Sequence, residues 1–203
     1  MYRLLINNNK CKIKSISKWE ESEVQFSELE WENIFELPFK ISQESKLQWL
    51  QFRILHRLFP CNYYLHRLKL VDSPLCVFCK RDLETIDHLF VECPCVKELW
   101  CRIEDWLLEK LDKYVGFNKQ AILFGKFANR NIHKVENLII LIVKHYINNS
   151  KFSNTSTCKL NIETLKKIIS DRIVVEKFLL LKNCKYNEFE RYWHEIYDKL
   201  VMD

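Results

Sequence analysis

The most informative stretch of this sequence is Cys76-Val-Phe-Cys79, followed by His88-Leu-Phe-Val-Glu-Cys93-Pro94. Its spacing is C-x2-C-x8-H-x4-C. Two cysteines separated by two residues can turn back so that both sulfurs face one point, as a tetrahedral Zn²⁺ site requires. His88 and Cys93 can supply the other two ligands from one short helix and its end. We therefore predict that Cys76, Cys79, His88 and Cys93 bind one zinc ion.

Four nitrogen and sulfur ligands leave no open position for water or substrate, so we predict a structural site rather than a catalytic one. The polar residues between the two ligand pairs predict an exposed knuckle. Two alternatives stay open: Cys95 can replace Cys93 as the fourth ligand, or these side chains are buried cysteines and a surface histidine without a metal. The other cysteines are predicted to pack as small apolar residues: Cys11, Cys61, Cys101, Cys158 and Cys184.

Composition favours a helical protein. The 203 residues include only two glycines and four prolines, so few residues interrupt helices and no glycine-rich phosphate loop is present. Nine cysteines without a secretory signal favour a reducing, intracellular compartment, with nucleus and cytoplasm left open. The longest strongly apolar run, 138–143, is far shorter than the roughly 20 residues that span a bilayer. We therefore expect a soluble, all-α protein.

Apolar periodicity and capping residues place the helices. Ser27 and Glu30 form a capping box for a helix that Pro38 should end, and Ser42 should cap the next helix, which should reach Pro60. Residues 71–83 should form a loop, Thr85 should cap a short helix, and Pro94 should begin a long one. The expected helices are 27–36, 42–59, 63–70, 85–93, 94–111, 132–149, 162–183 and 186–201, with a flexible linker at 148–157.

These segments suggest three regions. Residues 1–26 are poorly defined, residues 27–112 form a helical domain with the embedded CCHC zinc knuckle, and residues 113–203 form a C-terminal helical bundle. The helix at 132–149 is apolar nearly all round its middle, so we expect it at the centre of the C-terminal half.

Charge is distributed unevenly, although the net charge is only +5. No acidic residue occurs between Glu44 and Asp72, whereas residues 82–109 contain eight acids and two bases. On a helical wheel one face of the predicted helix forms a basic stripe of Lys46, Trp49, Arg53, His56 and Arg57. An exposed aromatic within such a stripe suits phosphate contact and base stacking. An ordinary solvated helix face, or a surface for an acidic partner, explains the stripe equally well. The candidate nucleic-acid-binding residues are Lys46, Trp49, Arg53, Arg57, Arg67 and Lys69.

The zinc motif, the run 46–58, the Glu84-Thr85 pair and Leu99-Trp100 together resemble the zinc-binding region of reverse transcriptases. Specifically, they resemble the C-terminal segment of the large open reading frame of LINE-like (non-LTR) retrotransposons. The resemblance is strong over residues 31–106. It implies the same four zinc ligands and a segment that follows the polymerase and helps it hold template RNA or target DNA during target-primed reverse transcription.

We therefore expect a non-catalytic, zinc-binding module whose partners are RNA or single-stranded DNA, and also the polymerase region of a retrotransposon protein. The sequence contains no adjacent Asp-Asp pair, so the metal-binding turn of a polymerase is missing, and no nucleophile triad can be recognised. No enzymatic activity is therefore expected. Two other readings remain. The chain can be a protein-interaction scaffold stabilised by structural zinc, or a retrotransposon relic without selected function.

Overall fold

The structure is a computed structural model that describes residues 14–21, 24–128, 131–152 and 160–201. Within those residues the protein is helical, apart from one pair of two-residue strands, which confirms the expected all-α class. The first half contains α2 (Lys14–Glu20), α3 (Glu28–Ile41), α4 (Ser45–Leu55), α5 (Asn62–Arg67), the π-helix η1 (His88–Glu92) and α6 (Pro94–Leu111). The second half contains α7 (Lys119–Phe124), β1 (Phe127–Ala128), β2 (Asn131–Ile132), α8 (Lys134–Lys151), α9 (Ile162–Lys182), α10 (Tyr186–Tyr192) and α11 (His194–Val201).

Helix α3 begins as predicted but ends later. The predicted capping box is present, because the Ser27 N–H donates to Glu30 Oε2 at 2.7 Å and the Glu30 N–H to Ser27 Oγ at 3.3 Å. Pro38 does not end the helix, since the apolar face of α3 continues through it to the buried Ile41. Ser42 closes α3 rather than capping α4, and its N–H donates to the Pro38 carbonyl at 3.1 Å.

Helix α4 is shorter than predicted at both ends. It begins at Ser45 and ends at Leu55, well before Pro60. Arg57 has a φ of 53°, in the left-handed region, and the Leu58 N–H donates to the Arg53 carbonyl at 2.7 Å. This tight turn redirects the chain so that Phe59 is buried in the core.

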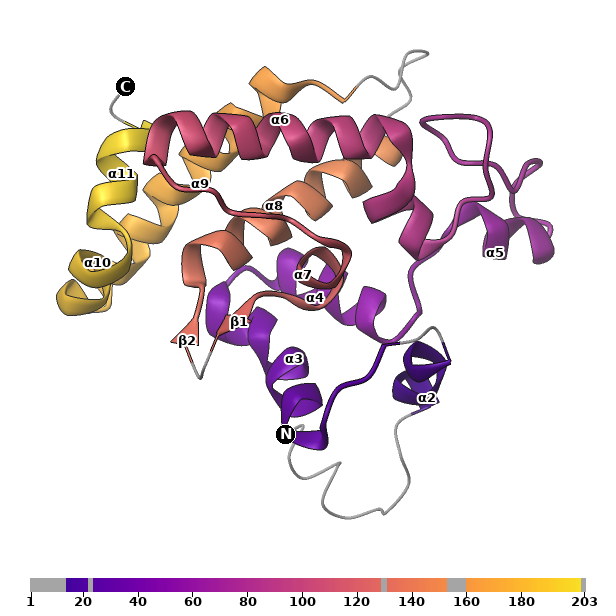
Figure 1. The fold of residues 1–203 in the computed structure, drawn as a ribbon, viewed down its shortest axis with the longest axis horizontal. Helices are drawn as coiled ribbons and strands as arrows, with labels where there is room; N and C mark the ends of the chain where they lie inside the picture. Colours follow the sequence, from indigo (N-terminus) through magenta and orange to yellow (C-terminus); the bar gives the residue numbers. More distant parts are fainter. Residues whose placement is uncertain (1–13, 22–23, 129–130, 153–159, 202–203) are drawn as a thin grey trace.

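Helix α8 lies at the centre of the molecule, and not only of the C-terminal half as predicted. It contacts α3 and α4 on one side and α9 on another (Figure 1). Helix α9 in turn contacts α6, α10 and α11. The predicted final helix is divided at Trp193, which is buried, and both resulting helices pack on α9. Part of the predicted linker 148–157 continues α8 to Lys151, and residues 153–157 of it lie outside the described residues.

The buried apolar side chains form one cluster that reaches from Ile16 to Leu200. Trp19 of α2 is fully buried, and its indole N–H donates to the Leu55 carbonyl at 2.8 Å. Residues 14–21, which the sequence left undefined, therefore pack against α4. The bounds 1–26, 27–112 and 113–203 remain sequence predictions.

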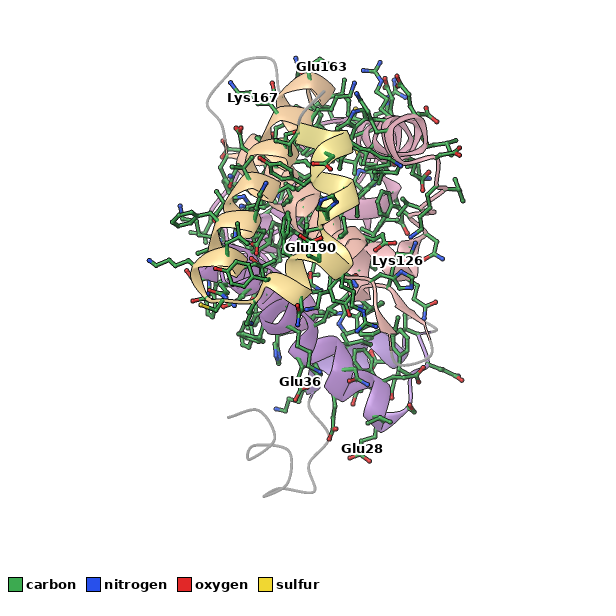
Figure 2. The ribbon with its side chains drawn as sticks, turned by 90° about the vertical axis from the view of Figure 1, so that its left-hand side faces the viewer. Glu28, Glu36, Lys126, Glu163, Lys167 and Glu190 are labelled. Carbon is green, nitrogen blue, oxygen red and sulfur yellow. The ribbon has the colours of Figure 1, made fainter. Side chains whose placement is uncertain are left out.

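Two views show how far the elements extend. In Figure 1, α5 and the loop that follows it project on the right, away from α10 and α11 on the left. Figure 2 shows Glu163 and Lys167 of α9 at one end of the molecule, with Glu28 and Glu36 of α3 at the other. Among the described residues, no helix combines the length and the apolar character needed to cross a bilayer.

Candidate metal centre and basic surface

The first two candidate ligands lie in a tight turn between α5 and η1. Leu75 and Leu83 form an antiparallel bridge, and inside it the Cys76 N–H donates to the Asp82 carbonyl at 2.8 Å. The Lys80 N–H donates to the Cys76 carbonyl at 3.0 Å. These bonds close the chain on itself, so that Cys76 and Cys79 face the same side. The predicted loop at 71–83 is confirmed.

The other two candidate ligands come from η1 and the residue that follows it. Thr85 begins this turn as predicted, since its Oγ1 accepts the His88 N–H at 3.1 Å. Five residues cover about 1.4 turns of an α-helix, which would direct His88 and Cys93 to different sides. The π-helical turn brings them to the same side, because it is wider than an α-helical turn. The Cys93 N–H donates to the His88 carbonyl at 2.8 Å and closes this turn.

The four side chains converge on one point. Their ligand atoms all lie within 4.8 Å of one another, with 3.8 Å between the sulfurs of Cys76 and Cys93 and 3.3 Å between Cys79 Sγ and His88 Nε2. Zinc–sulfur bonds of about 2.3 Å in a tetrahedron separate two sulfurs by roughly 3.8 Å. Spacing and donor chemistry therefore fit Zn²⁺. Cys95 is exposed and lies outside the cluster.

The surroundings favour thiolate, the form of cysteine that binds metal. The hydrogen bond with Cys93 lowers the pKa of Cys76 to about 5, and the N–H groups of Phe78 and Cys79 act in the same direction. The same pairing raises the pKa of Cys93, so the first proton of the pair is lost far more readily than the second. Cys93 also precedes the N-terminus of α6, whose N–H groups stabilise negative charge. A bound cation would remove the second proton as well.

The knuckle is less exposed than the sequence predicted. Glu84 is fully buried, as are Cys76 and Cys93, and η1 packs against α6 and α7. The prediction of an exposed knuckle rested on the polar residues between the two ligand pairs, of which Glu84 is one. The structure instead makes it a buried acceptor for two backbone N–H groups, that of Asn62 at the start of α5 and that of Val77 between Cys76 and Cys79.

The remaining cysteines only partly match their predicted role. Cys61 is buried, and burial raises the pKa of its thiol to about 12. The prediction that Cys101 and Cys184 are packing residues is wrong, because both are exposed. Cys11 and Cys158 lie outside the described residues.

The predicted basic stripe is divided in the structure. Lys46 and Trp49 are exposed on α4, whereas Arg53 is half-buried, with its guanidinium 5.6 Å from the centre of the Phe59 ring. Arg57 does not share the stripe because α4 has already ended, and its guanidinium lies 3.9 Å from the centre of the Trp19 ring. Arg67 and Lys69 are exposed at and after the end of α5, which Figure 1 places away from α4.

A ladder of aromatic rings, which sequence reasoning missed, supports Trp49. Trp31 stacks on Phe35 with ring centres 5.8 Å apart, and Phe35 stacks on His56 at 5.2 Å. His56 lies 4.2 Å from Phe52, which stacks on Trp49 at 5.2 Å with ring planes only 8° apart. The ladder thus runs from the core to a tryptophan that is 58% exposed. The i, i+3 and i, i+4 spacing of the aromatic residues could have predicted the ring contacts within each helical segment. It could not have predicted the contact between Phe35 and His56, which joins the two segments.

Comparison with known proteins agrees with the metal cluster. Residues 13–100 match the family model described as zinc-binding in reverse transcriptase. This segment runs from before α2 into α6 and contains all four side chains of the cluster. No curated protein matches the chain. Residues 13–100 are thus similar to the zinc-binding region of reverse transcriptases, as the sequence suggested, while the narrower LINE-like assignment remains a prediction.

Proposed function

We propose that this protein is a non-catalytic module in which Cys76, Cys79, His88 and Cys93 hold a structural zinc ion. The convergence of four sulfur and nitrogen atoms within 4.8 Å carries the proposal. When bound, zinc would fix the loop between α5 and η1 to the start of α6. Four protein ligands occupy every position of a tetrahedral ion, so the site supports structure rather than chemistry on a substrate. Thiolate ligands of this kind suit a reducing, intracellular compartment.

The metal site is tested by metal content. Purified protein should contain about one zinc per chain, bound through three sulfurs and one nitrogen. Cys76→Ser should lose the metal. Cys95→Ser is the matched control, since Cys95 lies close in sequence but outside the cluster, and it should retain full occupancy. Full zinc content in the Cys76→Ser protein, or its loss from Cys95→Ser alone, would contradict the ligand assignment.

We further propose that α4 binds single-stranded RNA or DNA, a role that the resemblance to the C-terminal segment of non-LTR retrotransposon reverse transcriptases implies for this region. Support comes from Trp49, which ends the aromatic ladder and is 58% exposed, beside the exposed Lys46 on the same helix. A flat ring already held in place loses little entropy when a base stacks on it. Lys46 and Arg53 supply positive charge for the phosphates on either side.

Binding of single-stranded RNA at several salt concentrations tests this surface. Trp49→Ala should weaken binding by about 1–3 kcal/mol if a base stacks there. Lys46→Ala should lower the log–log salt slope by roughly 0.7 if it contacts one phosphate. Phe178→Ala and Lys167→Ala are matched controls, because both residues are exposed on α9, and neither should change binding.

One observation favours the second candidate, a protein-interaction scaffold. Helix α5 contains no buried residue, and it exposes Tyr64 together with Leu68 and Leu70 just beyond its end. An apolar surface of this kind suits a protein partner such as a polymerase region. If the protein is such a scaffold, its RNA binding is weak, and substitutions at Trp49 and Lys46 of α4 do not change it. Parental RNA affinity in Trp49→Ala and Lys46→Ala would therefore support the scaffold.

A further inference from the structure

Glu84 is a buried carboxylate that joins three parts of the zinc region. Its Oε1 accepts the Asn62 N–H, at the start of α5, at 2.8 Å. Its Oε2 accepts the Val77 N–H, between Cys76 and Cys79, at 3.1 Å. Its own backbone N–H donates to the Pro74 carbonyl at 3.0 Å. One side chain with no solvent exposure thus determines the path of the loop that carries two metal ligands.

The charge of Glu84 is balanced from a distant part of the chain. Lys151, the last residue of α8, places its Nζ 2.5 Å from Glu84 Oε1 and donates a second bond to the Pro60 carbonyl at 2.7 Å. Its side chain is only 2% exposed. A buried carboxylate without a partner is strongly unfavourable, so removing Lys151 should disturb Glu84 and the loop bonds that Glu84 makes.

We propose that Glu84 and Lys151 are positioning residues for the zinc site, and that through this ion pair zinc binding and the docking of the C-terminal end of α8 stabilise one another. The inference rests on the proposed zinc site. The chain of contacts is continuous: α8 holds Lys151, Lys151 holds Glu84, and Glu84 holds the Val77 N–H within the Cys76–Cys79 turn. Docking of α8 should strengthen zinc binding, and zinc binding should strengthen the docking of α8 by the same factor, because linkage between two equilibria is reciprocal.

Zinc affinity, measured by competition with a chromophoric chelator, tests the proposal. Lys151→Met should lower affinity about tenfold, the range typical of residues that position metal ligands. Lys144→Met is the matched control: Lys144 lies two turns earlier on α8, is also buried, and bonds to Gln51 and to the Ile122 carbonyl instead of the zinc loop. Its variant should bind zinc within about twofold of the parent, the scatter we allow for sites that do not interact.

The double variant Glu84→Gln with Lys151→Met separates the ion pair from general packing. Its zinc affinity should still fall below that of the parent. Because the double variant leaves no unpaired buried charge, however, the loss should be smaller than the two single fold-losses multiplied together. The double variant also serves as the measurement if Lys151→Met alone does not fold. Cobalt(II) absorption provides a second readout, and the band intensities of tetrahedral thiolate ligation should weaken in Lys151→Met but persist in Lys144→Met.

Parental affinity in Lys151→Met, or in the double variant if the single one does not fold, would overturn the proposal. An equal loss in Lys144→Met would also overturn it, since α8 would then act through packing alone. Failure of the parent itself to bind zinc is a different result, because it would refute the metal site rather than its positioning by Glu84 and Lys151.

Discussion

Lys144 is a single residue whose environment could not be predicted from its position in an apolar helix. Its side chain is 1% exposed, and its Nζ donates to the Ile122 carbonyl at 2.7 Å and to Gln51 Oε1. Gln51 is itself held by a bond from its amide nitrogen to the Leu123 carbonyl at 2.8 Å. Burial lowers the pKa of Lys144 to about 7. The two oxygens accept hydrogen bonds from the amine whether or not it is charged.

This residue should produce a characteristic pH dependence. Its folded pKa of about 7 lies below its unfolded value of about 10.4, so between these values only the unfolded chain binds the proton. Stability therefore rises with pH above about 7, by up to roughly 1.4 kcal/mol per unit, while below 7 the buried charge is unfavourable. Urea unfolding at pH 6–9 should show the parent gaining stability relative to Lys144→Met as pH rises. If the stability of the two proteins changed with pH in parallel, the prediction would be contradicted. The cysteine thiols are the same in both proteins, so their titration cancels in this comparison.

At the scale of elements, the short helix α7 depends on the glycine that ends it. Sequence reasoning did not predict this helix, because six residues hold too little periodicity. Asn118 caps it by accepting the Ala121 N–H at 2.8 Å. Gly125 ends it with a φ of 100° and a ψ of 169°, a conformation nearly restricted to glycine. A Cβ there would overlap the Leu37 side chain and lie 3.1 Å from Asn137 Oδ1.

Gly125→Ala should therefore destabilise the protein by about 3 kcal/mol or more, from backbone strain together with a clash in the core. Gly116→Ala is the matched control. Its φ of 62° is also left-handed, but the added Cβ would meet only Tyr114, which is 70% exposed and can move. The control should lose about 1–2 kcal/mol. Thermal unfolding followed by circular dichroism compares the two variants, and equal losses would contradict the predicted clash with Leu37.

At the scale of the whole molecule, the zinc region and the C-terminal helices share one core. Cys76 and Cys93 are buried in the same cluster as Ile140 of α8 and Ile173 of α9. Most of that cluster is apolar packing among helices, which does not require a metal. The loop between α5 and η1 depends instead on a few backbone bonds and on the Glu84–Lys151 pair.

Chelation should therefore unfold the molecule locally rather than globally. We expect hydrogen exchange to accelerate over residues 62–93 and in the last turn of α8, while α9 and the first turns of α8 remain protected. Most helical circular dichroism should persist. Loss of the whole helical signal on chelation would show instead that the metal holds the entire core together.

Local patterns along the sequence were enough to predict the helical class, the start of α3, the start of α6 and the four candidate ligands. These features depend on local chemistry: a capping box, a proline in a first turn, and ligand spacing. The sequence also predicted that α8 lies at the centre of the C-terminal half, because a helix that is apolar on nearly every side has to be covered. Zinc motifs are legible for the same reason, since all four ligands come from eighteen consecutive residues.

Contacts between distant residues could be read from the three-dimensional fold alone. It placed Arg57 on Trp19, joined Phe35 to His56 in the aromatic ladder, and paired Glu84 with Lys151 across 67 positions of sequence. The physical reason is that a charge or a ring has the same local pattern whether its partner is water or another helix. Its partner depends on which faces the packing of the core brings together, and no spacing along one segment contains that information.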